Sequence, residues 1–143
     1  NRRPKEPLMS ATLNPYLSFV DNAKHAMAFY QTVFGGDLIS NTFGDFGMQG
    51  PDTDKIMHAQ LTTDKGFTIM ASDTPAHMEH KTGSAITISL SGNDAELRDY
   101  FWQLAEGGAI DTPLEKQVWG DEFGQLVDRF GVGWVVNLSG PPA

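Results

Sequence analysis

Residues 55–63, KIMHAQLTT, place the side chains best suited to chemistry on one face of a predicted strand. Alternate side chains of a strand point to opposite faces, so His58 and Gln60 would share one face. An imidazole, with an ordinary pKa of about 6.5, can act as an acid, a base or a metal ligand. His58 is therefore the candidate catalytic residue, the alternative being a hydrogen-bonded histidine that orders the sheet. Gln60 cannot act as a base, and we take it as a ligand-binding candidate.

Polar and aromatic side chains elsewhere could line the same kind of site. In SAITISL, residues 84–90, we expect Ile86 and the apolar residues that alternate with it to pack on a helix. Thr87 and Ser89 would then lie on the opposite face, toward a ligand. Trp119 lies in a predicted loop, where its ring could stack on a ligand or, alternatively, plug the core.

Five further His, Asp and Trp residues are expected to have structural roles. His77 and His80, in PAHMEHK, could share a metal on a helix face, but their spacing is not that of HExxH and their polar surroundings indicate a solvated loop. His25 falls on the surface of a predicted helix. Asp73 could cap a turn or line a pocket, and we favour the turn. Trp134 is expected to pack in the core.

Composition excludes several classes of function. The chain has no cysteine, so a metal would need His, carboxylate or amide ligands. A net charge of −8 and the lack of a basic run after Lys5 argue against a nucleic-acid partner. No apolar segment approaches the roughly 20 residues that span a bilayer. Residues 1–9 lack the apolar region of a secretory signal, and we expect a disordered tail on a cytoplasmic protein.

Elements that could position these side chains occur twice along the chain. Each half reads as a strand, a helix and three strands, with the helices at AKHAMAFYQTVF (23–34) and AELRDYFWQLAEGG (95–108). Asp21 or Asn22 could cap the first helix and Asn93 or Asp94 the second. Both helices end at a Gly-Gly pair, which indicates an internal duplication.

The predicted strands follow from alternating apolar residues and from turn signals. They cover residues 13–20, 37–43, 55–63 and 67–72 in the first half, and 84–90, 109–115, 125–128 and 134–138 in the second. We therefore predict an α+β fold of two tandem βαβββ modules with cup-shaped sheets, forming one domain over residues 10–140. Module one would cover residues 12–73, a linker 74–83 and module two 84–139.

Local motifs in both halves resemble the PhnB-like branch of the vicinal oxygen chelate superfamily, which includes glyoxalase and bleomycin-resistance proteins. The matching segments are NPYLSF (14–19), AFYQTVFGG (28–36), KIMHAQL (55–61), SLSGND (89–94), LAEGG (104–108), WGDEFGQLVDRFGVGW (119–134) and VVN (135–137). The resemblance implies a glyoxalase-like fold whose cup holds the site. It also places Asn14, Tyr16 and Asn137 near the cup, and Tyr16 joins the ligand-binding candidates.

In metal-dependent relatives, the resemblance implies four His or Glu ligands on the first and last strands of the two modules. Here the histidine positions fall on Pro15 and Ala85, and the acidic positions fall near Met70 and Val135. None of these side chains is a useful metal ligand. We therefore predict no metal residues of the usual kind and no cofactor, while a divalent metal at other residues stays open.

Three functions remain open at this point. The first is a small-molecule binding protein without the usual metal, as the resemblance to bleomycin-sequestering proteins implies. The second is a metal-dependent lyase, isomerase or dioxygenase with nonstandard ligands such as His58. The third is an interaction protein whose cups are filled by side chains. In each case we expect a homodimer, because two-module chains of this superfamily pair so that the cups close across the interface, and no membrane partner.

Overall fold

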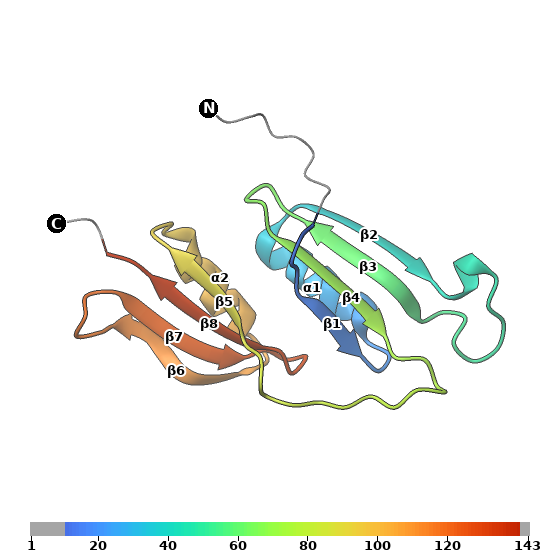
Figure 1. The fold of residues 1–143 in the computed structure, drawn as a ribbon. Coiled ribbons are helices and arrows are strands. Elements are labelled where there is room, and N and C mark those ends of the chain that lie inside the picture. The colour runs from blue at the N-terminus through green and yellow to red at the C-terminus, as the bar shows by residue number, and fades with distance from the viewer. Residues whose placement is uncertain (1–10, 141–143) are drawn as a thin grey trace.

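The computed structural model describes residues 11–140, so the tail predicted for residues 1–9 lies outside the described residues. It contains two four-stranded sheets, one per module, with one α-helix packed on each (Figure 1). In module one the sheet order is β1-β4-β3-β2, and β1 runs parallel to β4. Its elements are β1 (Tyr16–Phe19), α1 (Ala23–Phe34), β2 (Asp37–Thr42), the 3-10 helix η1 (Gly44–Phe46), β3 (Ile56–Thr62) and β4 (Thr68–Asp73).

Module two repeats this plan. Its sheet order is β5-β8-β7-β6, with β5 parallel to β8. Its elements are β5 (Ile88–Gly92), α2 (Glu96–Ala105), β6 (Ala109–Lys116), β7 (Glu122–Val127) and β8 (Gly133–Leu138). The α+β fold of two βαβββ modules predicted from the sequence is therefore confirmed.

The start of the second module differs from the prediction. β5 begins at Ile88, where pairing with Trp134 of β8 begins, and the chain before it runs as an extended connection beside both sheets (Figure 1). Ile86 consequently lies outside the sheet and is 85% exposed. The expectation that Ile86 packs on a helix is wrong, because strand alternation applies only where the strand is paired.

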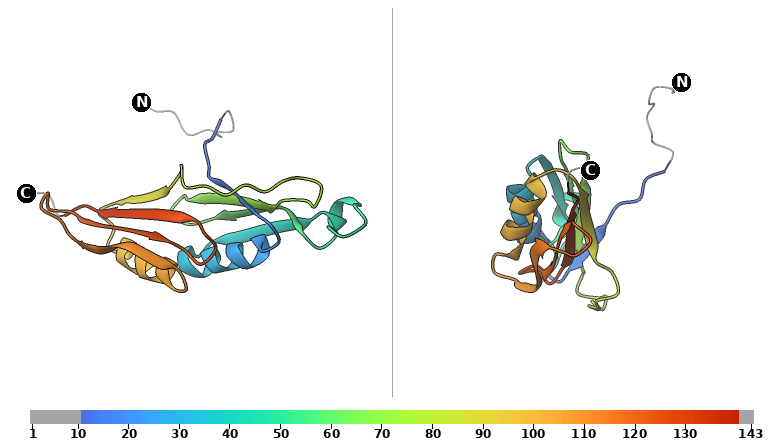
Figure 2. Two further views of the ribbon diagram at one scale, coloured as in Figure 1. Left: turned by 90° about the horizontal axis from the view of Figure 1, so that it is seen from below. Right: turned by 90° about the vertical axis from the view of Figure 1, so that its left-hand side faces the viewer.

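Both helices cover the same side of the two sheets, which lie next to each other (Figure 2). The core fills the space between helices and sheets and includes Tyr30 of α1, Phe101 of α2 and Trp134, as expected for Trp134. The other side of each sheet carries no helix, and we call it the open face. Among residues 11–140, no helix combines the length and apolar character required to cross a membrane.

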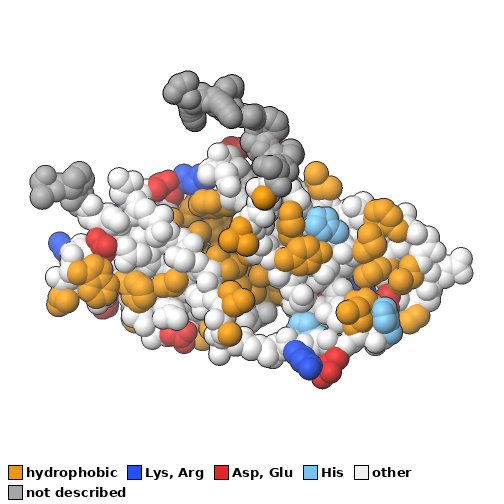
Figure 3. Space-filling view, viewed as in Figure 1, with side chains coloured by type: hydrophobic (Ala, Val, Ile, Leu, Met, Phe, Trp, Pro, Cys, Tyr) orange, Lys and Arg blue, Asp and Glu red, His pale blue; other side chains and the backbone are white. Residues whose placement is uncertain are grey.

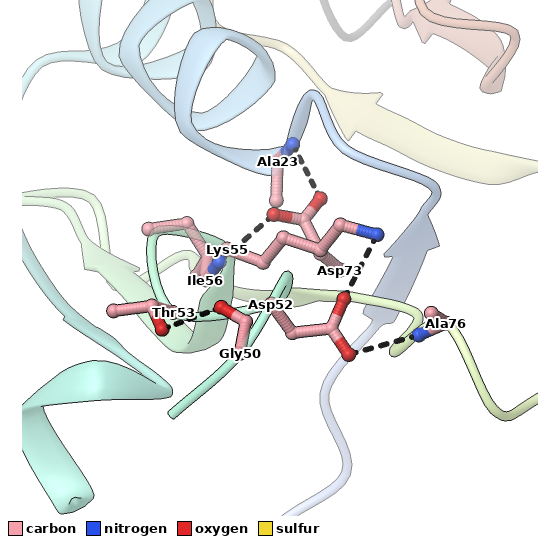
Figure 4. A network of polar contacts seen from close by, with 8 residues as sticks. All are labelled: Ala23, Gly50, Asp52, Thr53, Lys55, Ile56, Asp73 and Ala76. Atoms are coloured by element: carbon pink, nitrogen blue, oxygen red, sulfur yellow. Dashed lines mark hydrogen bonds and ion pairs between the residues drawn. The ribbon is translucent and has the colours of Figure 1, made fainter. Parts of the chain in front are cut away.

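Asp73 fixes the start of α1. Its buried carboxylate accepts hydrogen bonds from the backbone N–H groups of Ala23, at 2.9 Å, and Ile56, at 2.8 Å (Figure 4). Asn22 occupies the N-cap position without a side-chain cap hydrogen bond, so the predicted cap by Asp21 or Asn22 is not the one formed. The turn role favoured for Asp73 is also wrong, because β4 delivers its carboxylate to a helix N-terminus 50 residues earlier in the chain.

A second carboxylate, of Asp52, ties the loop after η1 to the connection between the modules (Figure 4). It accepts a hydrogen bond from the Ala76 N–H at 3.1 Å and lies 3.2 Å from Lys55 Nζ. The Ala76 N–H and the Lys55 ammonium hold the pKa of Asp52 below its ordinary value. The connection therefore leaves β4 along a defined path.

The two modules are joined by a buried carboxylate. Asp128, the residue after β7, accepts a hydrogen bond from the Tyr30 hydroxyl at 2.6 Å and from Trp134 Nε1 at 2.8 Å. The Phe130 and Val132 N–H groups also donate to it. Burial raises the pKa of Tyr30 far above its ordinary value, and the Asp128 carboxylate raises it further, so the phenol is neutral when the chain is folded.

This contact predicts a loss of stability at high pH. The pKa of Tyr30 lies above the unfolded value of about 10, so its stabilisation is complete below that pH and is lost as pH rises further. In urea unfolding followed by circular dichroism, we expect the unfolding free energy to fall above about pH 10 by roughly 1 kcal/mol per pH unit more in the wild type than in Tyr30→Phe. Equal slopes would contradict a buried neutral phenol at this position.

Candidate functional site

The open face of module one gathers three of the predicted site residues. Tyr16 of β1 lies opposite Met70 of β4, Met70 lies opposite Gln60 of β3, and Gln60 lies opposite Ile39 of β2. Residues opposite each other in a sheet share a face, so these four form one row across the open face. The row runs perpendicular to the strands and would be roughly 14 Å wide, from three strand spacings.

His58 stands beside this row. The Tyr16 hydroxyl lies 3.3 Å from His58 Nδ1, and the two rings are 5.8 Å apart between centroids. The phenol can donate to an unprotonated Nδ1, which would leave Nε2 to carry the ring proton and offer it to a ligand. Gln60 Nε2 lies 3.3 Å from Thr62 Oγ1 on the same face. The group can form directional hydrogen bonds and, through His58, exchange a proton.

The open face of module two carries the other predicted residues. Ser89 of β5 lies opposite Val135 of β8, which lies opposite Gln125 of β7. A Cβ added to Gly133 would lie 3.4 Å from Thr87 Oγ1, which places Thr87 against the beginning of β8.

Trp119 is part of the surface near this sheet. Its side chain is 58% exposed and its ring contacts Phe123 of β7 edge to face, with centroids 6.1 Å apart. The interpretation of Trp119 as a core plug is therefore wrong. The exposed ring is available for stacking, which leaves a binding role for Trp119 as a prediction.

Within one chain, these residues form two groups on two sheets. The sheets are open and uncurled, so a single copy does not enclose the predicted cup (Figure 2). A depression of about 520 Å³ lies elsewhere, at the start of α2 and the ends of the strands of module two. There Arg98 binds Glu122 through two nitrogen atoms, at 3.0 and 2.6 Å, and the pKa of Glu122 is lowered by this guanidinium.

The side chains on the open faces do not fit the usual metal site of this fold. The implied acidic positions, Met70 and Val135, lie opposite Tyr16 and Ser89, and none of these four offers a carboxylate or an imidazole. No group of three or more His, Asp or Glu residues that could hold a metal ion occurs within residues 11–140.

The other histidines lie apart from these groups. His77 and His80 follow β4 in the connection between the modules, where His80 Nε2 lies 3.1 Å from the Ser18 carbonyl oxygen. His25 is exposed on α1, as expected.

Sequence reasoning missed Phe123 and Gln125, which lie on the open face of module two. The internal duplication could have identified Gln125, because it pairs with Val135 as Gln60 pairs with Met70. Phe123 had no comparable signal, since its exposure depends on the register between β7 and β8.

The comparisons with known proteins agree with this fold. A family model described as 3-demethylubiquinone-9 3-methyltransferase matches residues 11–137. Protein YjdN of Escherichia coli K12 is 33% identical over 141 residues, covering 88% of this chain and 94% of YjdN.

Solved structures similar to this chain include PA1353 from Pseudomonas aeruginosa, which is 38% identical with a TM-score of 0.82. The match covers 91% of this chain and 98% of that one. A PhnB protein from Bacillus cereus, described as a putative 3-demethylubiquinone-9 3-methyltransferase, is 25% identical with a TM-score of 0.73 and coverage of 90% and 100%.

A glyoxalase/bleomycin resistance protein/dioxygenase family enzyme from Burkholderia phytofirmans shares the fold alone, at 16% identity. Its TM-score is 0.57, and the match covers 86% of this chain and 95% of that one. The expected superfamily is thereby confirmed. The chain belongs to the PhnB-like family whose model is described as 3-demethylubiquinone-9 3-methyltransferase, with the fold of the vicinal oxygen chelate superfamily.

Proposed function

We propose that this protein binds a small molecule on its open faces, without the usual metal site of the superfamily. The observation that carries this proposal is the row of hydrogen-bonding side chains on the open face of module one, where Tyr16, His58 and Gln60 lie beside apolar Met70 and Ile39. Sites of this mixed character orient a ligand by a few polar groups and bind it by apolar contact.

Two copies of the chain close the cup in this proposal. The open face exposes large apolar side chains that a single copy leaves in water, with Ile39 66% and Tyr16 50% exposed. A two-fold symmetric pair would bury these side chains and give each bound molecule a wall from each copy. The pairing thus supplies the enclosure that one uncurled chain lacks.

A metal-dependent lyase, isomerase or dioxygenase centred on His58 is the competing function. The His58–Tyr16 contact favours it, because a phenol beside an imidazole can assist proton transfer. Within residues 11–140, His58 belongs to no group of three or more His, Asp or Glu side chains that could hold a metal ion, which speaks against it. The family model is described as a methyltransferase. The two strand-to-helix connections, at residues 20–22 and 93–95, contain no glycine and so give no support to that activity.

A charged side chain at the centre of the row tests the binding site. We expect Gln60→Arg to weaken binding of fragment-library hits at least about tenfold, because it fills the face and removes the amide. Gln103→Arg introduces the same side chain at an exposed position of α2, on the opposite side of the molecule, and serves as the matched control. Nuclear magnetic resonance titrations of ¹⁵N-labelled protein give both affinities. Equal weakening by the two substitutions, or none by either, would argue against the open face as the site.

Light scattering at micromolar concentration tests the pairing. We expect a mass near two chains for the wild type and near one chain for Ile39→Asp, which places a charge in the proposed interface. Ala28→Asp, at an exposed position of α1, is the control and should retain the mass of two chains. A wild-type mass near one chain would refute the pairing.

A further inference from the structure

Six of the eight strands, all except β2 and β6, present open faces that lack full charges. We call these six the inner strands, and β2 and β6 the outer strands. On β1, β3 and β4 of module one, and on β5, β7 and β8 of module two, the side chains directed away from the helices are hydroxyl, amide, thioether, aromatic and aliphatic, with His58 as the one titratable imidazole. Figure 3 shows the same arrangement, with Lys, Arg, Asp and Glu side chains at the border of this face and apolar side chains over its middle. This occurs in a chain with 28 charged residues, 10 basic and 18 acidic.

The carboxylates on these six strands are turned toward the helices. They are Asp73, which accepts the Ala23 N–H at the start of α1, and Glu122, which binds Arg98 of α2 at 2.6 Å. Each already has a partner within its own module.

The basic side chains of residues 11–140 also lie outside the six inner strands. Lys65 binds Asp94 and Glu96, both at 2.6 Å, and the Arg129 guanidinium lies 4.5 Å from the centroid of the Phe29 ring. Acidic groups lie at the margins of the open faces. Asp37 and Glu115 of the outer strands lie opposite Thr62 and Phe123, and the Asp121 carboxylate, just before β7, accepts a hydrogen bond from the Asn137 amide at 2.9 Å. An anion on the open face would therefore lose water without gaining a cationic partner.

Burying a charged group without a partner is costly, whereas an uncharged polar group requires only a hydrogen bond. We infer that the ligand is an uncharged, planar molecule with both hydrogen-bond donors and acceptors, and that anions are rejected. This inference rests on the proposed binding function and adds the chemical class of the ligand. A second copy in the proposed pair contributes the same faces, with acidic groups only at the margins, and so adds no cationic partner for an anion.

The two amides define the polar part of this ligand. Gln60 and Gln125 occupy equivalent register positions, opposite Met70 and Val135, on the third strand of each module. A primary amide offers two donors and one acceptor, so each can pair with an amide or lactam group of a ligand. Tyr16 and Trp119, both at least half exposed, provide aromatic surface for a planar ring.

Three naphthalene probes of nearly equal shape test this inference. They are 2-naphthamide, which is uncharged, 2-naphthoate, an anion, and 2-naphthylmethylammonium, a cation. We expect titrations of the wild-type protein, followed by amide chemical shifts, to give an affinity for 2-naphthamide at least about tenfold higher than for either charged probe. The shifts should map to the open-face strands. Gln60→Lys should reverse the order in favour of 2-naphthoate, whereas Gln103→Lys, on α2, should leave it unchanged.

The outcomes separate this inference from the function on which it rests. Binding of 2-naphthoate or 2-naphthylmethylammonium to the open face as tightly as 2-naphthamide would overturn the uncharged ligand while retaining the binding function. If none of the three probes shifts the amide signals of the open-face strands, that result would contradict the binding function itself, and with it the inferred ligand class.

Discussion

The Asp128 carboxylate is the constraint on which the arrangement of the two modules depends. It receives hydrogen bonds from Tyr30 of module one and Trp134 of module two within a buried aromatic cluster. Phe130 adds ring contacts to Phe29 and Tyr30, with centroids 5.6 and 6.2 Å apart. A buried carboxylate that lost these donors would carry an uncompensated charge, so the contact specifies one relative position of the modules. Both helices are thereby held on one side and both open faces on the other (Figure 2).

This arrangement separates the charged and uncharged parts of the molecule. Carboxylates needed for the fold, such as Asp73 and Glu122, are satisfied on the helix side or at helix ends. The open faces keep hydroxyl, amide and aromatic groups that can bind an uncharged ligand and can also pack against a second copy. In the proposed function, the same chemistry serves both recognition and assembly. The positions that the resemblance implies for acidic metal ligands, Met70 and Val135, carry apolar side chains.

Local patterns predicted the parts of the structure that local forces determine. The spacing of apolar residues placed α1 at 23–34, and strand alternation placed His58 and Gln60 together on one face. Contacts between distant segments left no local signal: Tyr30 meets Asp128 across 98 positions, and Asp73 reaches the start of α1 across 50. The exposure of Trp119 likewise depends on tertiary packing. Enclosure of the site had no local signal either: the expectation that two copies close the cups came from the family resemblance alone, and it stays a prediction.

Metal content is the direct test of a binding face without the usual metal. The protein would be purified without a polyhistidine tag from cells grown with added zinc and manganese, and analysed by inductively coupled plasma mass spectrometry beside His58→Ala. We expect no metal above background in either protein, because His58 belongs to no group of three or more His, Asp or Glu side chains within residues 11–140 that could hold a metal ion. About one metal per chain in the wild type, lost in His58→Ala, would contradict a binding face without a metal and make His58 the centre of a metal site.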